Sequence, residues 1–301
     1  MITANLTGGL GNYMFQIGAA SSLASRVGDG VEAVFDFNQA QQPHTSIHAY
    51  TTNIFRNIKQ GVPHCTNNYS ERSDWVYREI PLVDSTYLSG YFQSHKFLNR
   101  DHILELFCVD SQTSTYIKEK YSEVLQKETV AVHVRRGDYL HLQHHHPVQS
   151  LEYYNNAISL YSPDSTFVIF SNDIEWCKSV FIGDAFYFIE GEEDYVDLYL
   201  MSMCKHAIIA NSSFSWWGAY LNNNPSRNIV YPTKWFGPAY EQVTTNDIFP
   251  ESWIGVGDTT SAIQVNLFDG AFQHLVQPDG RYSHVFWDLS KHMRIPSIWL
   301  Y

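Results

Sequence analysis

From residue 129 onward the chain alternates short apolar runs with stretches of helical spacing, and this alternation restricts its fold more than any other feature. The runs TVAVHV (129–134), TFVIF (166–170) and AIIA (207–210) are rich in β-branched residues and typical of buried strands. Strands that alternate with helices favour a parallel sheet with crossover helices on its faces. We therefore predict an α/β fold for this part of the chain.

The first part of the chain carries a weaker version of the same pattern. An apolar run at 1–6 precedes the glycine turn TGGLGN and a helix-like stretch at 12–27, and further strands are predicted at 32–37 and 86–92. Between about 40 and 85 few elements can be placed. Two strand–helix blocks predict two Rossmann-like domains that face a cleft.

Beyond the second block the composition changes. Asp-Gly turn signals separate short aromatic segments near the end of the chain, which predicts a small β-rich appendage with hairpins. We therefore divide the chain into a Rossmann-like domain at 1–126, a second one at 127–256, and an appendage of unknown role at 257–301.

The chain is acidic, with 19 Lys and Arg against 31 Asp and Glu and a formal net charge of −12. Nucleic acids and anionic membranes repel such a chain, so we expect neither as a partner. The N-terminus lacks a signal sequence, no run approaches the ~18 apolar residues of a membrane span, and the four cysteines form no C-x-x-C pair. These features predict a cytoplasmic protein with reduced thiols.

An acidic chain that binds an anion needs a local basic site, and the adjacent Arg135 and Arg136 provide a candidate. They directly follow the strand predicted at 129–134, and ligands bind at the carboxyl ends of strands in open α/β sheets. Arginine binds phosphate through two parallel hydrogen bonds and stays charged. The alternative is that the pair forms ordinary ion pairs with some of the acidic residues.

Three other motifs occupy turns between a strand and a helix. The glycines of TGGLGN (7–12) allow the backbone to approach a ligand, although such turns also occur for purely geometric reasons. The hydroxyl cluster in ANSSFSWW (210–217) can bind phosphate oxygens or cap the following helix. Asn172 and Asp173 can bind a guanine base or cap a helix, and capping is the commoner use.

The sequence contains no D-x-D, the carboxylate pair that usually carries a divalent metal for nucleotide-sugars, so no metal cofactor is predicted. His141, His144, His145 and His146 have metal-binding chemistry, but their spacing does not indicate a preformed site, and we interpret this segment as a loop at the mouth of the cleft. The aromatic content of 15% is high, which fits either core filling or flat apolar binding surfaces.

Taken together and in order, GGLGN, HVRRGDY, FSND and IIANSSFSWWGAYL resemble the bacterial α-1,2-fucosyltransferases of glycosyltransferase family 11. The resemblance covers about residues 1–256 and includes SGYFQS at 89–94. It implies a GT-B architecture and a metal-independent transfer of L-fucose, with inversion, from GDP-β-L-fucose to the 2-hydroxyl of a terminal galactoside. The implied partners are GDP-fucose and a galactose-containing oligosaccharide.

The resemblance also implies roles for individual residues. Arg135 would contact the β-phosphate of the leaving group, and Asn12 and Asp138 complete the predicted catalytic set. His133 and Asp173 would contact the guanine. The full donor-binding set, drawn from the same motifs, is Gly9, Gly11, His133, Arg136, Asn172, Asp173, Asn211, Ser212, Ser213, Phe214 and Ser215.

The sequence leaves several points open. The general base is either Asp138, beside the arginines, or Asp36, at the end of the strand predicted at 32–37, and a dissociative transition state would need little base. Tyr13 replaces the glutamine usual in the family, which changes either acceptor contacts or packing. The alternative functions are a transferase for another GDP-sugar or linkage, and a nucleotide-sugar or glycan binding protein without turnover.

Overall fold

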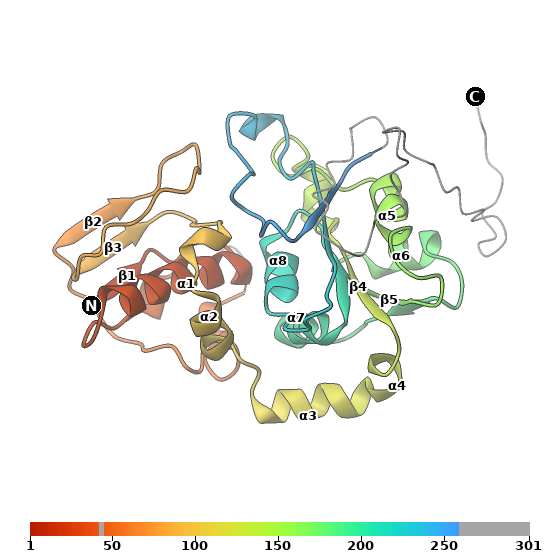
Figure 1. Ribbon diagram of the computed structural model, residues 1–301, viewed down its shortest axis with the longest axis horizontal. Helices are drawn as coiled ribbons and strands as arrows, with labels where there is room; N and C mark the ends of the chain where they lie inside the picture. Colours follow the sequence, from red (N-terminus) through yellow and green to blue (C-terminus); the bar gives the residue numbers. More distant parts are fainter. Residues whose placement is uncertain (42–44, 259–301) are drawn as a thin grey trace, which may run out of the picture.

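The computed structural model describes residues 1–41 and 45–258, and these form two parallel sheets joined through a helical layer (Figure 1). The smaller sheet has the order β1-β3-β2, with β1 at Ile2–Ala4, β2 at Asn67–Ser70 and β3 at Thr86–Ser89. The larger sheet has the order β6-β5-β4-β7-β8-β9. Its strands are β4 Thr129–Val134, β5 Thr166–Ser171, β6 Phe186–Phe188, β7 His206–Ile208, β8 Ile229–Pro232 and β9 Ile254–Val256. The prediction of an α/β fold with parallel sheets is confirmed.

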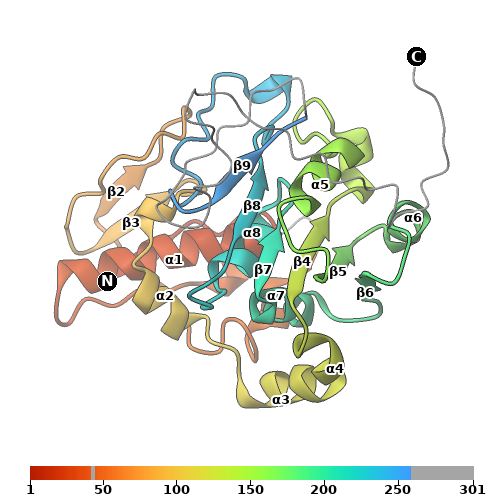
Figure 2. The same ribbon diagram turned by 45° about the vertical axis from the view of Figure 1, so that its right-hand side comes forward.

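The larger sheet has the strand order of a doubly wound Rossmann fold. Alternate residues of β4 face opposite cores: Val130 and Val132 pack with α5 (Leu151–Ile158) and α6 (Ile174–Val180), whereas Ala131 packs with the helices of the other face. Those helices are α7 (Asp194–Met203) and α8 (Ser213–Tyr220) (Figure 2). The strand order reverses between β4 and β7, so a crevice is expected at the carboxyl ends of these two strands.

Helix α1 (Leu10–Val27) lies against α8 and connects the two sheets (Figures 1 and 2). The Phe15 ring centroid lies 4.5 Å from that of Trp216 and 5.0 Å from that of Trp217. The indole of Trp217 also donates to the backbone oxygen of Gly11 at 2.9 Å. One hydrophobic cluster therefore runs through both halves. The division into domains at 1–126 and 127–256 stays a prediction, but these halves share a core.

The remaining described helices connect the sheets or shape their loops. The α-helices among them are α2 (Arg100–Leu106), α3 (Ser111–Lys120) and α4 (Ser122–Leu125). The 3-10 helices are η1 (Phe37–Gln39), η2 (Ile47–Tyr50), η3 (His95–Phe97), η4 (Gly137–His141) and η5 (Pro238–Tyr240). Asn99 and Asp110 begin α2 and α3, because each side chain accepts a hydrogen bond from a backbone N–H of the first turn.

Two strand predictions in the first half need correction. The strand predicted at 32–37 is wrong: only isolated bridges form there, at Ala33 and Phe35, and Asp36 starts η1 instead by accepting from the Asn38 N–H. The strand predicted at 86–92 ends at Ser89, because Gly90 (φ +154°) and Phe92 (φ +54°) turn the chain away from the sheet. Strands β2 and β9 were not predicted.

All four cysteines lie in the described part of the chain, where none of them forms a disulfide. Across the described residues we find no helix with both the length and the apolarity needed to cross a membrane. The predicted appendage at 257–301 falls outside the described residues, apart from Gly257 and Asp258.

Candidate functional site

The candidate site lies at the carboxyl ends of β4 and β7, where the strand order of the larger sheet reverses. Strand β4 ends at Val134 and continues directly into Arg135 and Arg136, and α8 begins a few residues after β7. The sequence forms this edge because β-branched runs stop at polar, turn-forming residues on both strands. Arginine side chains and a helix N-terminus, both of which favour anions, are thereby brought to one edge of the sheet.

Arg135 makes two contacts with its own turn. Its guanidinium donates to the Asp138 carboxylate at 2.7 Å and lies over the ring of Tyr139, with 5.1 Å between the guanidinium carbon and the ring centroid. Its Nε is buried and has no hydrogen-bond partner among the described residues. The alternative of an ordinary ion pair is therefore realised in this structure, but one buried donor of Arg135 is left for a ligand.

Arg136 is held more completely. Its Nε donates to Asp173 at 2.9 Å, and its guanidinium lies 3.9 Å from the centroid of the Trp176 ring. Asp173 also caps α6 by accepting from the Trp176 N–H at 3.4 Å. These contacts suit a supporting role for Arg136. They also show that helix capping, the commoner use of Asp173, takes place here.

Asn172 fixes the turn that follows the arginines. Its side-chain oxygen accepts from the Arg136 backbone N–H at 2.9 Å. Gly137 has a φ of +38°, and a Cβ at that position would lie 2.2 Å from the Asn172 amide nitrogen. The backbone conformation therefore favours glycine at 137, and the missing Cβ leaves room for the Asn172 side chain. Asn172 acts on the loop in this structure, through two contacts within the chain.

His133 and Phe214 pack together beneath the arginines. His133 is 6% exposed, and its ring centroid lies 5.6 Å from that of Phe214. Burial, followed by the charge of Arg135, lowers the pKa of His133 to about 3. The imidazole is therefore neutral at physiological pH, and it offers one hydrogen-bond donor and one acceptor.

Buried polar atoms without partners concentrate at this site. Six such side-chain atoms occur in the described residues, and three belong to the predicted site: His133 Nδ1, Arg135 Nε and Asn211 Oδ1. Folded proteins rarely leave buried polar groups unpaired, and a binding site is a common place for the exceptions because the ligand supplies the missing partners. The concentration therefore marks this edge of the sheet as a place for a polar ligand.

In the serine-rich turn before α8, some side chains are hydrogen-bonded within the described part of the protein, and others are not. Asn211 donates to the backbone oxygens of Pro147 and Trp235 at 2.9 and 3.0 Å, so its amide nitrogen ties neighbouring loops together. Ser215 is fully buried, and its hydroxyl lies within hydrogen-bond distance of the Ala210 and Ser212 carbonyl oxygens. These contacts occupy the hydroxyl within its own turn, which does not favour the predicted role of Ser215 in donor binding. Ser212 is 8% exposed and makes no side-chain cap to α8.

The glycine turn before α1 meets the start of α8. A Cβ at Gly11 would lie 2.5 Å from the backbone carbon of Ser213, so this glycine permits close packing of two helices. Gly9 is exposed with no atom near its missing Cβ, and only this glycine of the predicted pair remains free to approach a ligand. Asn12 accepts from the Gln93 side chain at 2.8 Å. The N-termini of α1 and α8 thus lie side by side.

A pocket of about 160 Å³ opens at this junction, with walls from both halves of the chain. It is lined by Asn12, Trp75, Tyr91, Gln93, Tyr139, His146, Asn211, Ser213, Trp235, Phe236 and Tyr240. Only Asn12, Asn211 and Ser213 among these were predicted as site residues. His146 belongs to the loop predicted at the cleft mouth. Within residues 1–41 and 45–258, no three His, Cys, Asp or Glu side chains are grouped so that they could hold a metal ion.

The aromatic wall of this pocket was not predicted from the sequence. Trp75 contacts Tyr91, Phe236 and Tyr240, with centroid separations of 5.8, 5.2 and 5.6 Å. It comes from the segment at 40–85, where the sequence shows little periodicity. The only signal in the sequence is the high aromatic content, which fits core filling equally well.

The two candidate bases occupy different surroundings. Asp138 is ion-paired with Arg135, whereas Asp36 accepts hydrogen bonds from the Asn38 N–H and the Gln39 side chain, both at 3.0 Å. Neither carboxylate lines the pocket. Tyr13, the departure from the family pattern, is fully buried and donates its hydroxyl to the Gln41 carbonyl at 3.2 Å, so it acts in packing.

Glu71 holds the loop that supplies Tyr91 and Gln93 to the pocket. One of its carboxylate oxygens accepts from the backbone N–H groups of Tyr91 and Phe92 at 2.8 and 2.9 Å. We expect Glu71→Ala to lower the free energy of unfolding by about 2–3 kcal/mol, because two backbone donors lose their partner. Glu71→Gln should cost less, since its amide oxygen can still accept. Urea denaturation measures both, and equal losses would show that the side chain acts only by filling space.

The known proteins to which this chain is similar are glycosyltransferases. The model of glycosyl transferase family 11 matches residues 1–257. The O-antigen biosynthesis glycosyltransferase WbnK and an α-1,2-colitosyltransferase, both from Escherichia coli, are each 34% identical over 185 residues, which is 56% of this chain. The match spans 60% and 61% of those two proteins. Galactoside α-(1,2)-fucosyltransferase 2 of Pongo pygmaeus is 29% identical over 297 residues, 87% of this chain and 80% of that protein.

Among solved structures, the fucosyltransferase NodZ from Bradyrhizobium is similar, with 14% sequence identity and a TM-score of 0.47. The similarity covers 72% of this chain and 92% of that one.

Proposed function

Because this chain belongs to glycosyl transferase family 11, we propose that it transfers L-fucose from GDP-β-L-fucose to the 2-hydroxyl of a terminal galactoside, with inversion and without a divalent metal. The observation that carries the proposal is that Arg135 follows β4 beside β7, at the crevice of the larger sheet, while the N-terminus of α8 that follows β7 packs against that of α1. A GT-B arrangement, with the donor on the larger sheet and the acceptor entering from the smaller one, is part of this proposal.

The proposed chemistry is a direct displacement. The bond from the anomeric carbon to the GDP β-phosphate oxygen breaks as the bond from the acceptor 2-hydroxyl oxygen forms, and the acceptor loses its proton. Negative charge grows on the β-phosphate during this step. Arg135 and the backbone N–H groups at the two helix N-termini would stabilise that charge, because fixed donors aimed at a developing charge cost no reorganisation. Inversion follows from attack on the face opposite to GDP.

The proposed donor contacts include the unpartnered Nδ1 of His133. His133 Nδ1 and the Asp173 carboxylate would contact the guanine, with Asp173 keeping its ion pair to Arg136. Ser212 and Ser213 would donate to phosphate oxygens at the start of α8, and Gly9 would allow the sugar to approach the backbone. Asp138 would release Arg135 to the phosphate, and either Asp138 or Asp36 would take the acceptor proton. Ser215 has no part in this scheme, because it is buried.

A second donor sugar is supported by one observation. One of the E. coli relatives at 34% identity is an α-1,2-colitosyltransferase, so transfer of colitose in place of fucose is the second candidate. A protein that binds the nucleotide-sugar without turnover is the third.

A transfer assay distinguishes the three candidates. The purified protein is incubated in EDTA with GDP-fucose or GDP-colitose and a panel of β-galactosides, and the linkage of any product is determined by NMR. A fucosylated 2-hydroxyl supports the proposal, and faster turnover of GDP-colitose supports the second candidate. Binding of GDP-fucose by calorimetry without any product would favour the binding protein. A dependence on added metal would contradict the proposed charge stabilisation by Arg135.

The aromatic wall is proposed to hold the acceptor. We expect Trp75→Ala to raise the acceptor KM about tenfold or more while the KM for GDP-fucose changes less than twofold, because Trp75 joins the wall from the half opposite to the arginines. Tyr87→Ala is the matched control, since this aromatic residue is exposed on β3 and does not line the pocket. If Trp75→Ala raises the KM for both substrates equally, Trp75 stabilises the protein as a whole and does not bind the acceptor specifically.

A further inference from the structure

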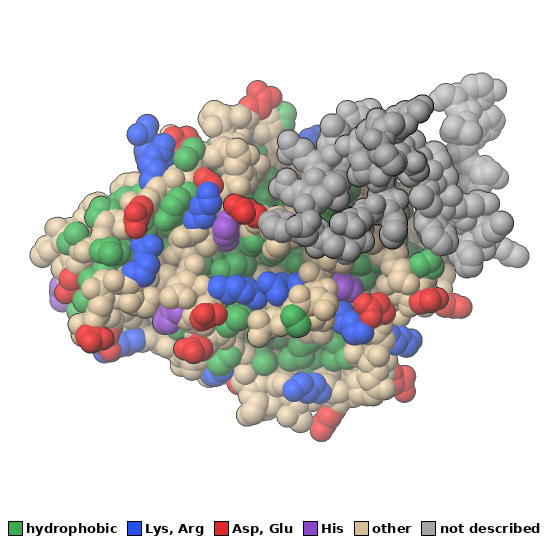
Figure 3. All heavy atoms as spheres, in the orientation of Figure 1, with side chains coloured by type: hydrophobic (Ala, Val, Ile, Leu, Met, Phe, Trp, Pro, Cys, Tyr) green, Lys and Arg blue, Asp and Glu red, His purple; other side chains and the backbone are tan. Residues whose placement is uncertain are grey.

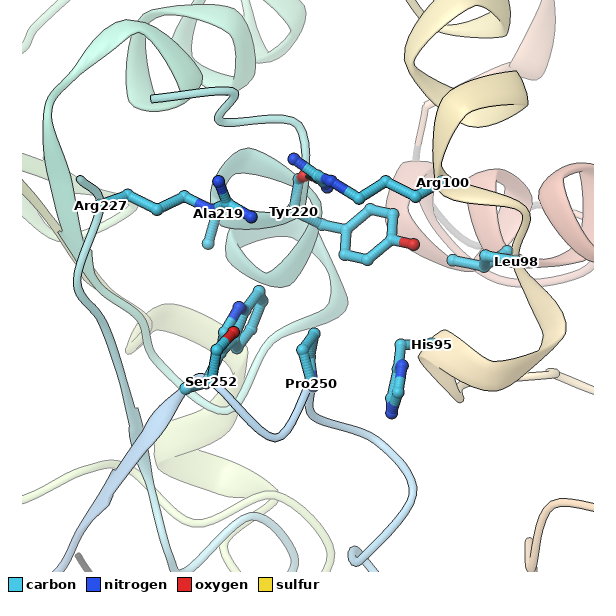
Figure 4. Close-up of a pocket in the computed structure, with 9 residues that line it drawn as sticks. His95, Leu98, Arg100, Ala219, Tyr220, Arg227, Pro250 and Ser252 are labelled. Atoms are coloured by element: carbon cyan, nitrogen blue, oxygen red, sulfur yellow. Dashed lines mark hydrogen bonds between the residues drawn. The ribbon is translucent and has the colours of Figure 1, made fainter. Parts of the chain in front are cut away.

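A second pocket lies at the opposite end of α8. The N-terminal residue of α8, Ser213, lines the candidate site, whereas Ala219 and Tyr220 near its C-terminus line a separate cavity of about 290 Å³. The other residues around this cavity are His95, Leu98, Arg100, Arg227, Pro250, Ser252 and Trp253 (Figure 4). It is larger than the pocket of the candidate site, and nothing in the proposed reaction uses it.

Two arginines enter this cavity from different halves of the chain. Arg100 comes from α2, and Arg227 precedes β8 of the larger sheet. Figure 4 shows the two side chains extending toward one another from opposite sides, with their guanidinium groups above Ala219 and Tyr220. In the space-filling view, basic side chains gather over α8 near the middle of the face shown (Figure 3). Two cations thus share one concave surface.

Arg100 also has a structural task. It donates to the backbone oxygens of Tyr220 and Asn222, at and just beyond the last turn of α8, and lies over the Tyr220 ring at 5.0 Å. An arginine at a helix C-terminus is favourable on its own, because the carbonyl groups there carry partial negative charge. These contacts hold the guanidinium in place, and the helix end supplies no full negative charge to balance it.

Fewer contacts hold the guanidinium of Arg227 than that of Arg100. Its guanidinium donates to the backbone oxygen of Asn224 at 3.0 Å, a neutral acceptor within its own turn. Burial, and after it the charge of Arg100, lower the pKa of Arg227. A guanidinium whose charge is disfavoured by its surroundings gains most from an added anion. The lowered pKa and the converging geometry therefore point in the same direction.

No carboxylate among the described residues lines the cavity, although Asp247 and Glu251 act electrostatically on His95, one of its lining residues. Four of the eight arginines in residues 1–41 and 45–258 form ion pairs with aspartates, and neither arginine of the cavity is among them. In a chain with 31 acidic residues against 19 basic ones, two facing arginines without a carboxylate are unexpected on composition alone.

We propose that this cavity binds a small oxyanion of the phosphate class, held by bidentate contacts from Arg100 and Arg227. Planar guanidinium groups match the geometry of phosphate oxygens, and two of them neutralise a dianion. The bound anion connects α2 to the segment before β8 and so joins the two halves of the chain on the side remote from the candidate active site. The proposed oxyanion site is independent of the identity of the transferred sugar.

Calorimetric titration with inorganic pyrophosphate tests the proposal in the full chain. Pyrophosphate resembles the phosphate part of the proposed donor, so the wild-type protein should show two binding events. Arg227→Gln should weaken one of them at least tenfold and leave GDP affinity within about twofold, whereas Arg135→Ala should weaken the other. Arg227→Lys should restore part of the binding, because it keeps the charge. Raising the ionic strength should weaken the event that depends on Arg227.

Arg227 is the better position for this test because Arg100 also caps α8. Unchanged GDP binding by Arg227→Gln shows that the variant is folded. The proposal is overturned if Arg227→Gln binds pyrophosphate as the wild type does, or if Arg135→Ala abolishes every binding event. If the Arg227-dependent event is present and the Arg135-dependent one is absent, the oxyanion site stands, whereas the proposed ground-state contact of Arg135 with the donor phosphates fails.

Discussion

Arg135→Ala should lower kcat with GDP-fucose by about 10³-fold while the affinity for GDP-fucose falls less than tenfold. The reason is that negative charge on the β-phosphate is greatest in the transition state, so a fixed cation contributes more there than to binding of the ground state. Removal of a single donor from a preorganised anion site typically costs about 10²–10³ in rate. Arg135 also has a buried Nε that no described residue satisfies, which a phosphate oxygen would pair.

The measurement separates kcat by steady-state kinetics from donor affinity by calorimetry. Arg135→Lys keeps the charge and loses the planar fork, and it should recover part of the rate. Arg72→Ala is the matched control, because Arg72 is exposed and pairs with Asp74 outside the site. If binding and rate fall by the same factor in Arg135→Ala, then Arg135 binds the donor uniformly and does not act on the leaving group.

Gly11→Ala should destabilise the protein by about 2–3 kcal/mol, although alanine is the better helix former. The added Cβ would lie 2.5 Å from the Ser213 carbon and 2.7 Å from the Phe214 nitrogen, and these backbone atoms cannot move aside as a flexible side chain can. The helices α1 and α8 would have to separate, and the indole bond from Trp217 to the Gly11 carbonyl would lengthen. We expect Tm to fall by roughly 5–10 °C.

Gly9→Ala provides a control two residues away. Gly9 has a φ of −92° and no atom within 4 Å of its missing Cβ, so the substitution should cost less than about 1 kcal/mol. Thermal unfolding of the two variants measures the difference. We also expect Gly11→Ala to reduce kcat, since the two helix N-termini that face the proposed leaving group would shift. Equal Tm values for both variants would disprove the packing role of Gly11.

Much of the larger sheet could be predicted from sequence, and less of the smaller one. Strands β4, β5 and β8 are runs of buried β-branched or aromatic residues, whose preference for extended structure is local. Strand β2 has the sequence NNYS and is largely exposed, so it has no apolar pattern. Its pairing with β3 comes from its position at the edge of the sheet, which no local preference encodes.

The candidate site, too, could be predicted from the sequence only in part. Its location at the ends of β4 and β7 follows from the motifs, because strand ends and helix starts are visible in the sequence. The partners of its residues were not predictable in the same way. Asp173 was assigned to a ligand and also pairs with Arg136, and the aromatic wall led by Trp75 comes from a segment without periodicity.

The sequence by itself determined a parallel α/β fold and the strand ends where Arg135 and the α8 turn lie, since hydrophobic periodicity and turn residues act over a few neighbouring positions. The tertiary structure alone decided that Gly11 packs against Ser213, that Ser215 is buried, and that Arg100 and Arg227 face one cavity. Each of these depends on how one element packs against others, and such contacts can join residues as far apart as Gly11 and Trp217, 206 positions along the chain. The physical reason is that side-chain surroundings form only when elements pack, and close packing follows the shape of the assembled core more than any local pattern.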